Sequence, residues 1–138
     1  MGVSVRLANI DDCEAVVALW QDAGLTRPWN DPRADFKLAV NQPLSAILLE
    51  TNDNSVVGSV MVGFDGHRGW VYYLATSVEH RGEGLGRKLM KEAENWLRAR
   101  GCPKIQLMVR RDNSEALGFY EAIGYELQDV VTMGRRLD

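Results

Sequence analysis

The stretch between Trp70 and Arg100 constrains the fold of this chain more than any other part of it. It begins with an aromatic, apolar and β-branched run from Trp70 to Thr76, which predicts a buried strand. A glycine-rich segment with the letters HRGEGLG follows at residues 80–86 and leads into a strongly amphipathic helix that ends at Gly101. We call residues 80–86 the glycine arch. A strand, a glycine-rich loop and a helix together can bind phosphate, because glycines let backbone N–H groups approach an anion and the helix N-terminus adds a charge of roughly +0.5.

The spacing of the glycines separates three nucleotide-binding motifs. A dinucleotide fingerprint and a P-loop, both counted from Gly82, require a further glycine at the position that Arg87 occupies, so neither motif is present. The pattern that fits is R-x-x-G-x-G, formed by Arg81, Gly84 and Gly86. The arch therefore predicts an anion site of a different kind.

Composition limits the classes of function. At 138 residues the chain has the length of one domain, and we expect a single domain over residues 1–138. The net charge of −3, from 16 basic and 19 acidic residues, argues against a nucleic-acid partner. No apolar run approaches the length of a membrane span and no basic, then apolar leader is visible, so we expect no membrane partner and a cytoplasmic protein. Cys13 and Cys102 lack metal-ligand spacing, and no metal site is expected.

The rest of the chain alternates between strand and helix signals. Asn9 and Asp31 are expected N-caps, Gly24 and Gly124 are expected helix ends, and residues 52–54 are typical of a hairpin turn. The expected elements are a strand at residues 3–8, helices at 10–23 and 32–40, strands at 45–51, 56–64 and 70–76, a helix at 85–100, a strand at 105–109, a helix at 114–123 and a final strand from Tyr125.

Two segments carry a resemblance to a known family. The glycine arch resembles the first signature of the GNAT (GCN5-related) N-acetyltransferases, and NSEALGFYEAIGY at residues 113–125 resembles the second. RPWNDP at 27–32 and DGHRG at 65–69 are similar to the small bacterial YpeA-type acetyltransferases. The resemblance implies an α/β (α+β) fold: a mixed central sheet of six to seven strands, mostly antiparallel with a splayed parallel pair at the cofactor site, flanked by four helices.

The resemblance also implies an acetyl-CoA-dependent acyltransferase and assigns roles to particular residues. Thr76 would supply a backbone N–H to the oxyanion that forms during acyl transfer. Tyr120 would protonate the leaving thiolate, since a phenol with a pKa near 10 is protonated at neutral pH. The residues expected to bind acetyl-CoA or coenzyme A are Leu74, Ala75, Thr76, Arg81, Gly82, Glu83, Gly84, Leu85, Gly86, Arg87, Asn113 and Tyr120.

The sequence says less about the acceptor and the general base than about the cofactor site. An alkylamine must lose a proton before it attacks, yet the segment from Trp70 to Ser77 contains no acidic residue. A relay of ordered waters is the interpretation we prefer for that proton. The alternatives are Asp65 and His67 in the preceding turn, or Tyr72 and Tyr73 acting through water. The candidate residues for acceptor binding are Trp29, Asp31, Asp65, His67 and Tyr72.

Three functions are consistent with these features. The first is acetylation of a primary amine on a small molecule or peptide, and the second is acetylation of a protein N-terminus or lysine. The third is a non-catalytic module that binds or senses acyl-CoA. A homodimer is a further expectation.

Overall fold

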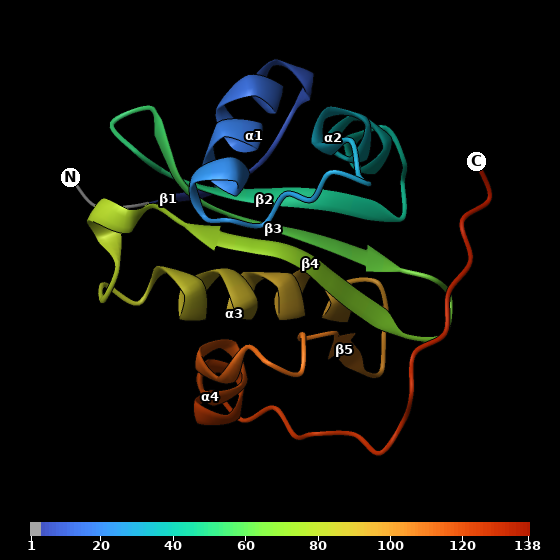
Figure 1. The fold of residues 1–138 in the computed structure, drawn as a ribbon. Helices are drawn as coiled ribbons and strands as arrows, with labels where there is room; N and C mark the ends of the chain where they lie inside the picture. The colour runs from blue at the N-terminus through green and yellow to red at the C-terminus, as the bar shows by residue number, and fades with distance from the viewer. Residues whose placement is uncertain (1–3) are drawn as a thin grey trace. The chain divides into compact units, whose positions relative to one another are not determined.

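The computed structural model describes residues 4–138, and the chain forms two compact units. The first unit ends at Met108 and the second runs from Val109 to Asp138. Figure 1 shows the elements of the first unit, which in chain order are β1 (Ser4–Leu7), the 3-10 helix η1 (Ile10–Asp12), α1 (Cys13–Asp22), α2 (Pro32–Val40), β2 (Ser45–Asn52), β3 (Ser55–Phe64), β4 (Gly69–Thr76), the 3-10 helix η2 (Val78–His80), α3 (Leu85–Arg98) and β5 (Ile105–Leu107). The second unit contains one helix, α4 (Ser114–Ala122).

The strands form one mixed sheet in the order β1-β2-β3-β4-β5. The first four strands pair antiparallel, while β4 and β5 pair parallel through the crossover that contains α3. The parallel pair is short, because β5 pairs only with Gly69, Trp70 and Val71 of β4. The remaining part of β4 therefore continues past the end of β5.

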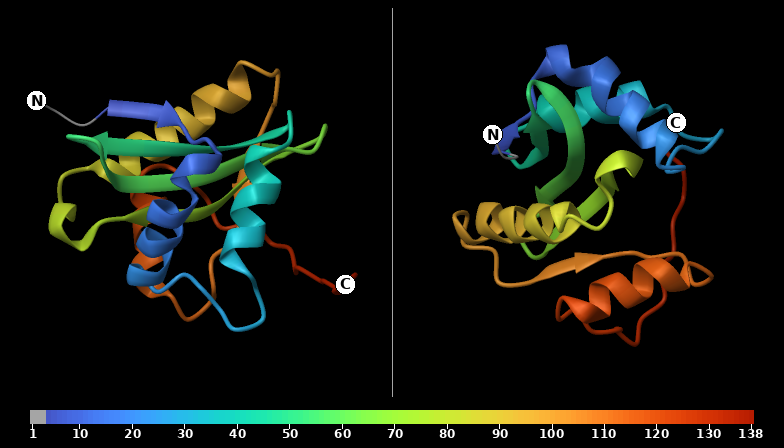
Figure 2. Two further views of the ribbon diagram at one scale, coloured as in Figure 1. Left: turned by 90° about the horizontal axis from the view of Figure 1, so that it is seen from above. Right: turned by 90° about the vertical axis from the view of Figure 1, so that its left-hand side faces the viewer.

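Helices cover both faces of the sheet in the first unit. α1 and α2 lie on one face and α3 lies on the other, as Figures 1 and 2 show. Beneath α1 and α2 the core includes the fully buried side chains of Trp20, Phe36, Ile47 and Leu49. On the opposite face α3 buries the apolar stripe formed by Leu85, Leu89, Met90, Ala93 and Leu97.

Local signals in the sequence explain where these elements start and turn. Asn9 forms a capping box with Asp12 at the start of η1, which leads directly into α1. The hairpin between β2 and β3 turns at Asp53 and Asn54, which have φ values of 51° and 67°, as a two-residue loop of this kind requires. No helix of residues 4–138 combines the length and the apolar character needed to cross a membrane.

The expected number of strands is wrong. Residues 4–138 form five strands rather than six to seven, together with the four expected α-helices. Val3, the expected first residue of the first strand, lies outside the described residues.

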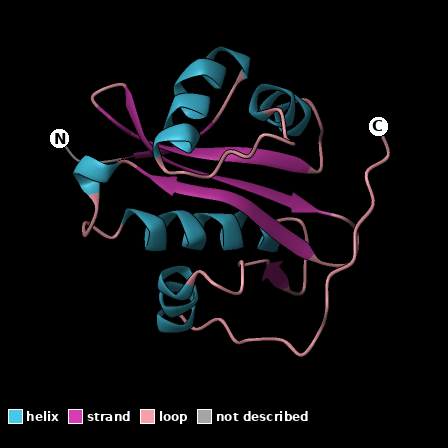
Figure 3. Cartoon of the chain, viewed as in Figure 1, coloured by secondary structure: helices cyan, strands magenta, loops and turns pink. Residues whose placement is uncertain are grey.

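The expected strand from Tyr125 accounts for the difference. Residues 125–138 form no regular element (Figure 3). Only four residues lie between Asp129 and Gly134, and Thr132 among them is polar. The apolar side chains of Val131 and Met133 are 86% and 92% exposed. Such a segment buries too little apolar surface to offset the conformational entropy that an ordered strand loses.

The second unit is organised by the ends of α4. The side chain of Asn113 caps the helix by accepting a hydrogen bond from the Ala116 N–H at 3.0 Å. After the helix, the Tyr125 N–H donates to the Tyr120 carbonyl at 2.9 Å. The Tyr120 ring makes edge contacts with the rings of Phe119 and Tyr125, at centroid distances of 5.0 and 5.9 Å.

Candidate cofactor and acceptor site

The glycine arch joins η2 to α3 and leaves the start of α3 without a side-chain cap. Gly82 and Gly84 have φ values of 83° and 79°, a left-handed conformation that suits glycine. Gly84 is the N-cap residue of α3, no side chain accepts a hydrogen bond there, and the first turn contains no acidic residue. A Cβ at Gly82 or Gly84 would meet nothing within 4 Å, so space is open beside the arch.

The start of α3 differs from the starts of α2 and α4. Asp31 caps α2 by accepting from the N–H groups of Arg33 and Ala34, and Asn113 caps α4. The first turn of α3 instead carries Arg87 and Lys88. Uncapped N–H groups next to basic side chains could hold an anion, which makes the start of α3 the candidate site for the pyrophosphate group of coenzyme A.

The strand before the arch supplies unpaired backbone. β5 ends at Leu107, opposite Val71, so among residues 4–138 no strand pairs with residues 72–76 on that edge of β4. Leu74, Ala75 and Thr76, which the resemblance assigns to cofactor binding, lie on this segment. The Ala75 side chain is 3% exposed and belongs to the core under α1, so only the backbone of Ala75 is available to a ligand.

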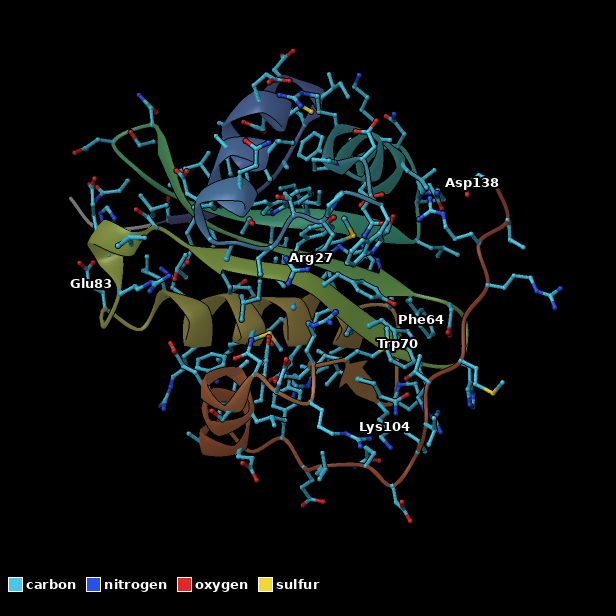
Figure 4. All side chains as sticks on the ribbon, viewed as in Figure 1. Arg27, Phe64, Trp70, Glu83, Lys104 and Asp138 are labelled. Carbon is cyan, nitrogen blue, oxygen red and sulfur yellow. The ribbon has the colours of Figure 1, made fainter. Side chains whose placement is uncertain are left out.

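The DGHRG turn lies at the end of β4 away from the glycine arch. Figure 4 labels Trp70 at one end of this strand and Glu83 in the arch beyond the other. An eight-residue strand spans about 23 Å, so the structure does not bring Asp65 or His67 to the arch.

Asp65 has a clear role in its own turn. Its Oδ1 accepts hydrogen bonds from the N–H groups of His67 and Arg68 at 2.8 and 2.7 Å, and its Oδ2 accepts from Trp70 Nε1 at 3.3 Å. The backbone hydrogen bonds from Arg68 and His67 lower the pKa of Asp65. Burial, and then the charge of Asp65, raise the pKa of Tyr72, so these two candidates lie within electrostatic range of each other.

The other acceptor candidates lie elsewhere. Trp29 is 59% exposed on the loop between α1 and α2. The Oδ1 atom of Asp31 accepts from the backbone at the start of α2. Their roles toward an acceptor stay predictions.

Tyr120, the expected general acid, is protonated at neutral pH. Burial raises its pKa to about 12. Tyr120 and Asn113 both belong to the second unit, and the Asn113 side chain already serves as the cap of α4. Their contacts with the cofactor stay predictions.

A network that links α2 to β4 was not predicted from the sequence. Tyr73 donates a hydrogen bond from Oη to Oδ2 of Asp35 at 2.7 Å, and its ring stacks on Trp20 with a centroid distance of 3.9 Å and an angle of 10°. Trp20 in turn donates from Nε1 to Ser59 Oγ at 3.0 Å. Asp35 and Tyr73 are 38 residues apart, and only the fold brings them together.

The buried Glu50 is a second feature that was not predicted from the sequence. Its side chain is fully buried on β2, and neither carboxyl oxygen has a hydrogen-bond partner. Burial raises the pKa of Glu50 to about 7, while the positive charge of Lys88 on α3 acts in the opposite direction. The signal in the sequence was a single acid that follows the apolar run Ile47-Leu48-Leu49 inside an expected strand.

The fold and the anion site together define a class of protein, the α/β enzymes that hold a phosphate-bearing cofactor at the start of a helix that follows a strand. Comparison with known families narrows this class. Residues 11–125 match the profile of the Acetyltransferase (GNAT) family, and the chain belongs to this family. This membership confirms the expected type of enzyme, an acetyl-CoA-dependent N-acetyltransferase.

Relatives cover nearly the whole chain. Acetyltransferase ECA0875 of Pectobacterium atrosepticum is 45% identical over 135 residues, which span 98% of this chain and 96% of that protein. An acetyltransferase of Yersinia pestis is 43% identical over the same shares of the two chains.

Solved structures share the fold at low sequence identity. AAC(6')-Iy, solved in complex with the bisubstrate analogue CoA-S-monomethyl-acetylneamine, has a TM-score of 0.84 at 15% identity and covers 99% of both chains. The ribosomal-protein-alanine N-acetyltransferase of Brucella melitensis has a TM-score of 0.79 at 19% identity, covering 99% of this chain and 100% of that one.

Proposed function

We propose that this protein transfers the acetyl group of acetyl-CoA to a primary amine of a small molecule by direct attack in a ternary complex. The observation that carries the proposal is the uncapped start of α3 at Gly84, beside the unpaired edge of β4. The pyrophosphate would bind the N–H groups of the glycine arch, with Arg81 and Arg87 as the nearest basic side chains in sequence. The pantetheine arm would then lie along residues 74–76 of β4.

In this reaction the protein mainly positions the amine and the thioester for direct attack. The amine nitrogen forms a bond to the thioester carbonyl carbon, the carbon–sulfur bond breaks, and coenzyme A leaves as the thiol. We assign the Thr76 backbone N–H to the oxyanion and the Tyr120 hydroxyl to the leaving sulfur. Because the segment from Trp70 to Ser77 contains no acid, we assign removal of the amine proton to ordered water.

Two observations support a small-molecule acceptor. AAC(6')-Iy, which shares this fold, was solved with an analogue that joins coenzyme A to acetylneamine. Acidic and aromatic side chains also occur on the segments before α2 and β4 and on β4 itself. Our candidates for enclosing a cation remain Trp29, Asp31, Asp65, His67 and Tyr72. A cytoplasmic location and a homodimer stay predictions.

Calorimetric titration with acetyl-CoA and coenzyme A, beside an assay of free-thiol release over a panel of amines and peptides, tests the proposal. We expect binding, and thiol release that depends on small primary amines. Release only with peptides or proteins would favour acetylation of an N-terminus or lysine. Binding without release on any acceptor would contradict the enzyme and favour a sensing module.

A further inference from the structure

We propose that Asp35 and Tyr73 bind a second positive charge on the acceptor, so that preferred acceptors carry a primary amine and another cationic group. This inference rests on the proposed function and names the substrate class of the same site. The simplest acceptors of this class are diamines.

The Tyr73 side chain is held in one orientation by two contacts. Its hydroxyl donates to Asp35 on α2 at 2.7 Å, and its ring lies flat on Trp20 of α1. Trp20 is itself tied to the sheet through Ser59. A side chain fixed in this way is preorganised for binding, because it has little rotamer freedom left to lose when a ligand arrives.

The backbone of Tyr73 is strained. Its φ of 56° is an outlier for an aromatic residue, and it lies where the register between β3 and β4 shifts. Such a conformation is energetically costly, and strain of this kind concentrates at functional sites. The effect of the bulge is to place the Tyr73 ring among α1 and α2, one residue before the expected cofactor segment begins at Leu74.

The arrangement of the helices indicates the side from which an acceptor approaches. On the face opposite Tyr73, α3 fills the space against the sheet with buried Leu89, Met90 and Ala93. An acceptor that reaches the free edge of β4 from the face of α1 and α2 meets Tyr73 and Asp35 instead. The Asp35 carboxylate bonds to the end of the Tyr73 side chain, so it lies away from the β4 backbone by the length of that side chain. It can therefore bind a cationic group of the acceptor that is remote from the reacting nitrogen.

Asp35 has no cationic partner in the part of the chain that the structure describes. Its side chain is half-buried, and none of the ion pairs among residues 4–138 includes it. Arg33, on the same helix, is paired with Glu14 at 2.8 Å. Burial, and then the bond to Asp35, raise the pKa of Tyr73, which therefore remains a neutral donor. Pairing with a cation lowers the free energy of a half-buried carboxylate whose other hydrogen-bond partner is a neutral donor.

A purely structural role would be to fasten α2 to the sheet, and the test separates the two roles. We would titrate the coenzyme A-loaded protein with 1,5-diaminopentane and with pentylamine, which have the same carbon chain and differ in one amine. Free-thiol release from acetyl-CoA with each amine is measured in parallel. Wild type should bind the diamine at least about tenfold more tightly, and Asp35→Asn should lower diamine affinity about 10- to 100-fold while leaving the monoamine unchanged.

Two control variants show whether an effect comes from the negative charge of Asp35. Asp22→Asn on α1 removes an exposed carboxylate away from Tyr73 and should leave both affinities unchanged. Asp35→Glu retains the charge and should retain a preference for the diamine. Equal affinity of wild type for the two amines, or an equal loss for both in Asp35→Asn, would overturn the proposal. The affinities for the two amines decide this inference, whether or not thiol is released. If no thiol were released with either amine, that result would count against the proposed function alone.

Discussion

The carboxyl group of Glu50 occupies the space that a side chain at Gly58 would need. The two residues are directly opposite on β2 and β3, and a Cβ on Gly58 would lie 2.5 Å from Oε1 of Glu50 and 3.0 Å from Cδ1 of Leu89. A glycine thus accommodates a buried acid between the sheet and α3. The first two predictions follow from this pair.

Gly58→Ala should destabilise the protein by about 1–3 kcal/mol, because a methyl group would overpack a filled core. Urea unfolding measures the change in free energy. Adding Glu50→Ala removes the atom that clashes most closely, so the double variant should lose less than the sum of the two single losses. Strict additivity would show that the two side chains do not compete for this space.

Glu50 should make stability depend on pH. Its pKa is about 7 in the folded protein and near 4.5 when unfolded, so the folded state binds more protons between these values. The free energy of unfolding should therefore fall as pH rises from about 4.5 to 7, by on the order of 1–3 kcal/mol in total.

Glu50→Gln should flatten this dependence and be more stable than wild type at pH 8. Urea unfolding at pH 5 and pH 8 measures the difference. The carboxyls with a lowered pKa, those of Asp12, Glu14, Asp65 and Asp138, act in the opposite direction and below this range. An unchanged slope in Glu50→Gln would show that the buried carboxyl does not titrate as stated.

Asp31 can be tested for two roles with two substitutions. Asp31→Ala removes the cap of α2 and should cost about 1 kcal/mol of stability, whereas Asp31→Ser keeps a capping oxygen and should cost much less. Asp31→Ser also removes the negative charge, so if Asp31 helps to enclose a cationic acceptor, as proposed, the KM for the amine should rise about threefold or more in this variant. An unchanged KM in the serine variant would show that Asp31 serves only as the cap of α2.

Tyr120→Phe tests the assigned general acid. If the phenol protonates the leaving sulfur, kcat should fall about 100-fold or more while the affinity for acetyl-CoA is retained. Tyr125→Phe removes a hydroxyl from the neighbouring ring and serves as the matched control. Since the pKa of Tyr120 is about 12, wild-type kcat should not decline through ionisation of this group below about pH 10. An unchanged kcat in Tyr120→Phe would exclude the role.

Much of the fold was readable because local chemistry decides it. Asn9 and Asp31 begin helices by capping them, and Asp53 and Asn54 tolerate the positive φ values of the hairpin. The glycines of the arch could likewise be assigned to a strand-to-helix turn. Family membership then followed from two short signatures.

Other features could not be read because tertiary contacts override local preference. Nothing near Tyr73 favours a positive φ, and its partner Asp35 belongs to an earlier helix. The carboxyl group of Glu50 fits in the core beside residue 58 because that residue, on the next strand, is glycine. The tail after Tyr125 has apolar residues but no strand partner in residues 4–138, and its composition alone did not reveal that.

The most direct test of the account is the affinity for acetyl-CoA in a matched pair of variants at the two ends of α3. Gly84 and Gly101 have φ values of 79° and 78°, and a Cβ at either meets nothing within 4 Å, so an aspartate strains both backbones alike. Gly84→Asp places a negative charge and a capping side chain where the pyrophosphate should bind. Calorimetry should show at least a tenfold loss of affinity for Gly84→Asp and near wild-type affinity for Gly101→Asp. Equal affinities in the two variants would contradict the claim that the glycine arch and the start of α3 hold the cofactor.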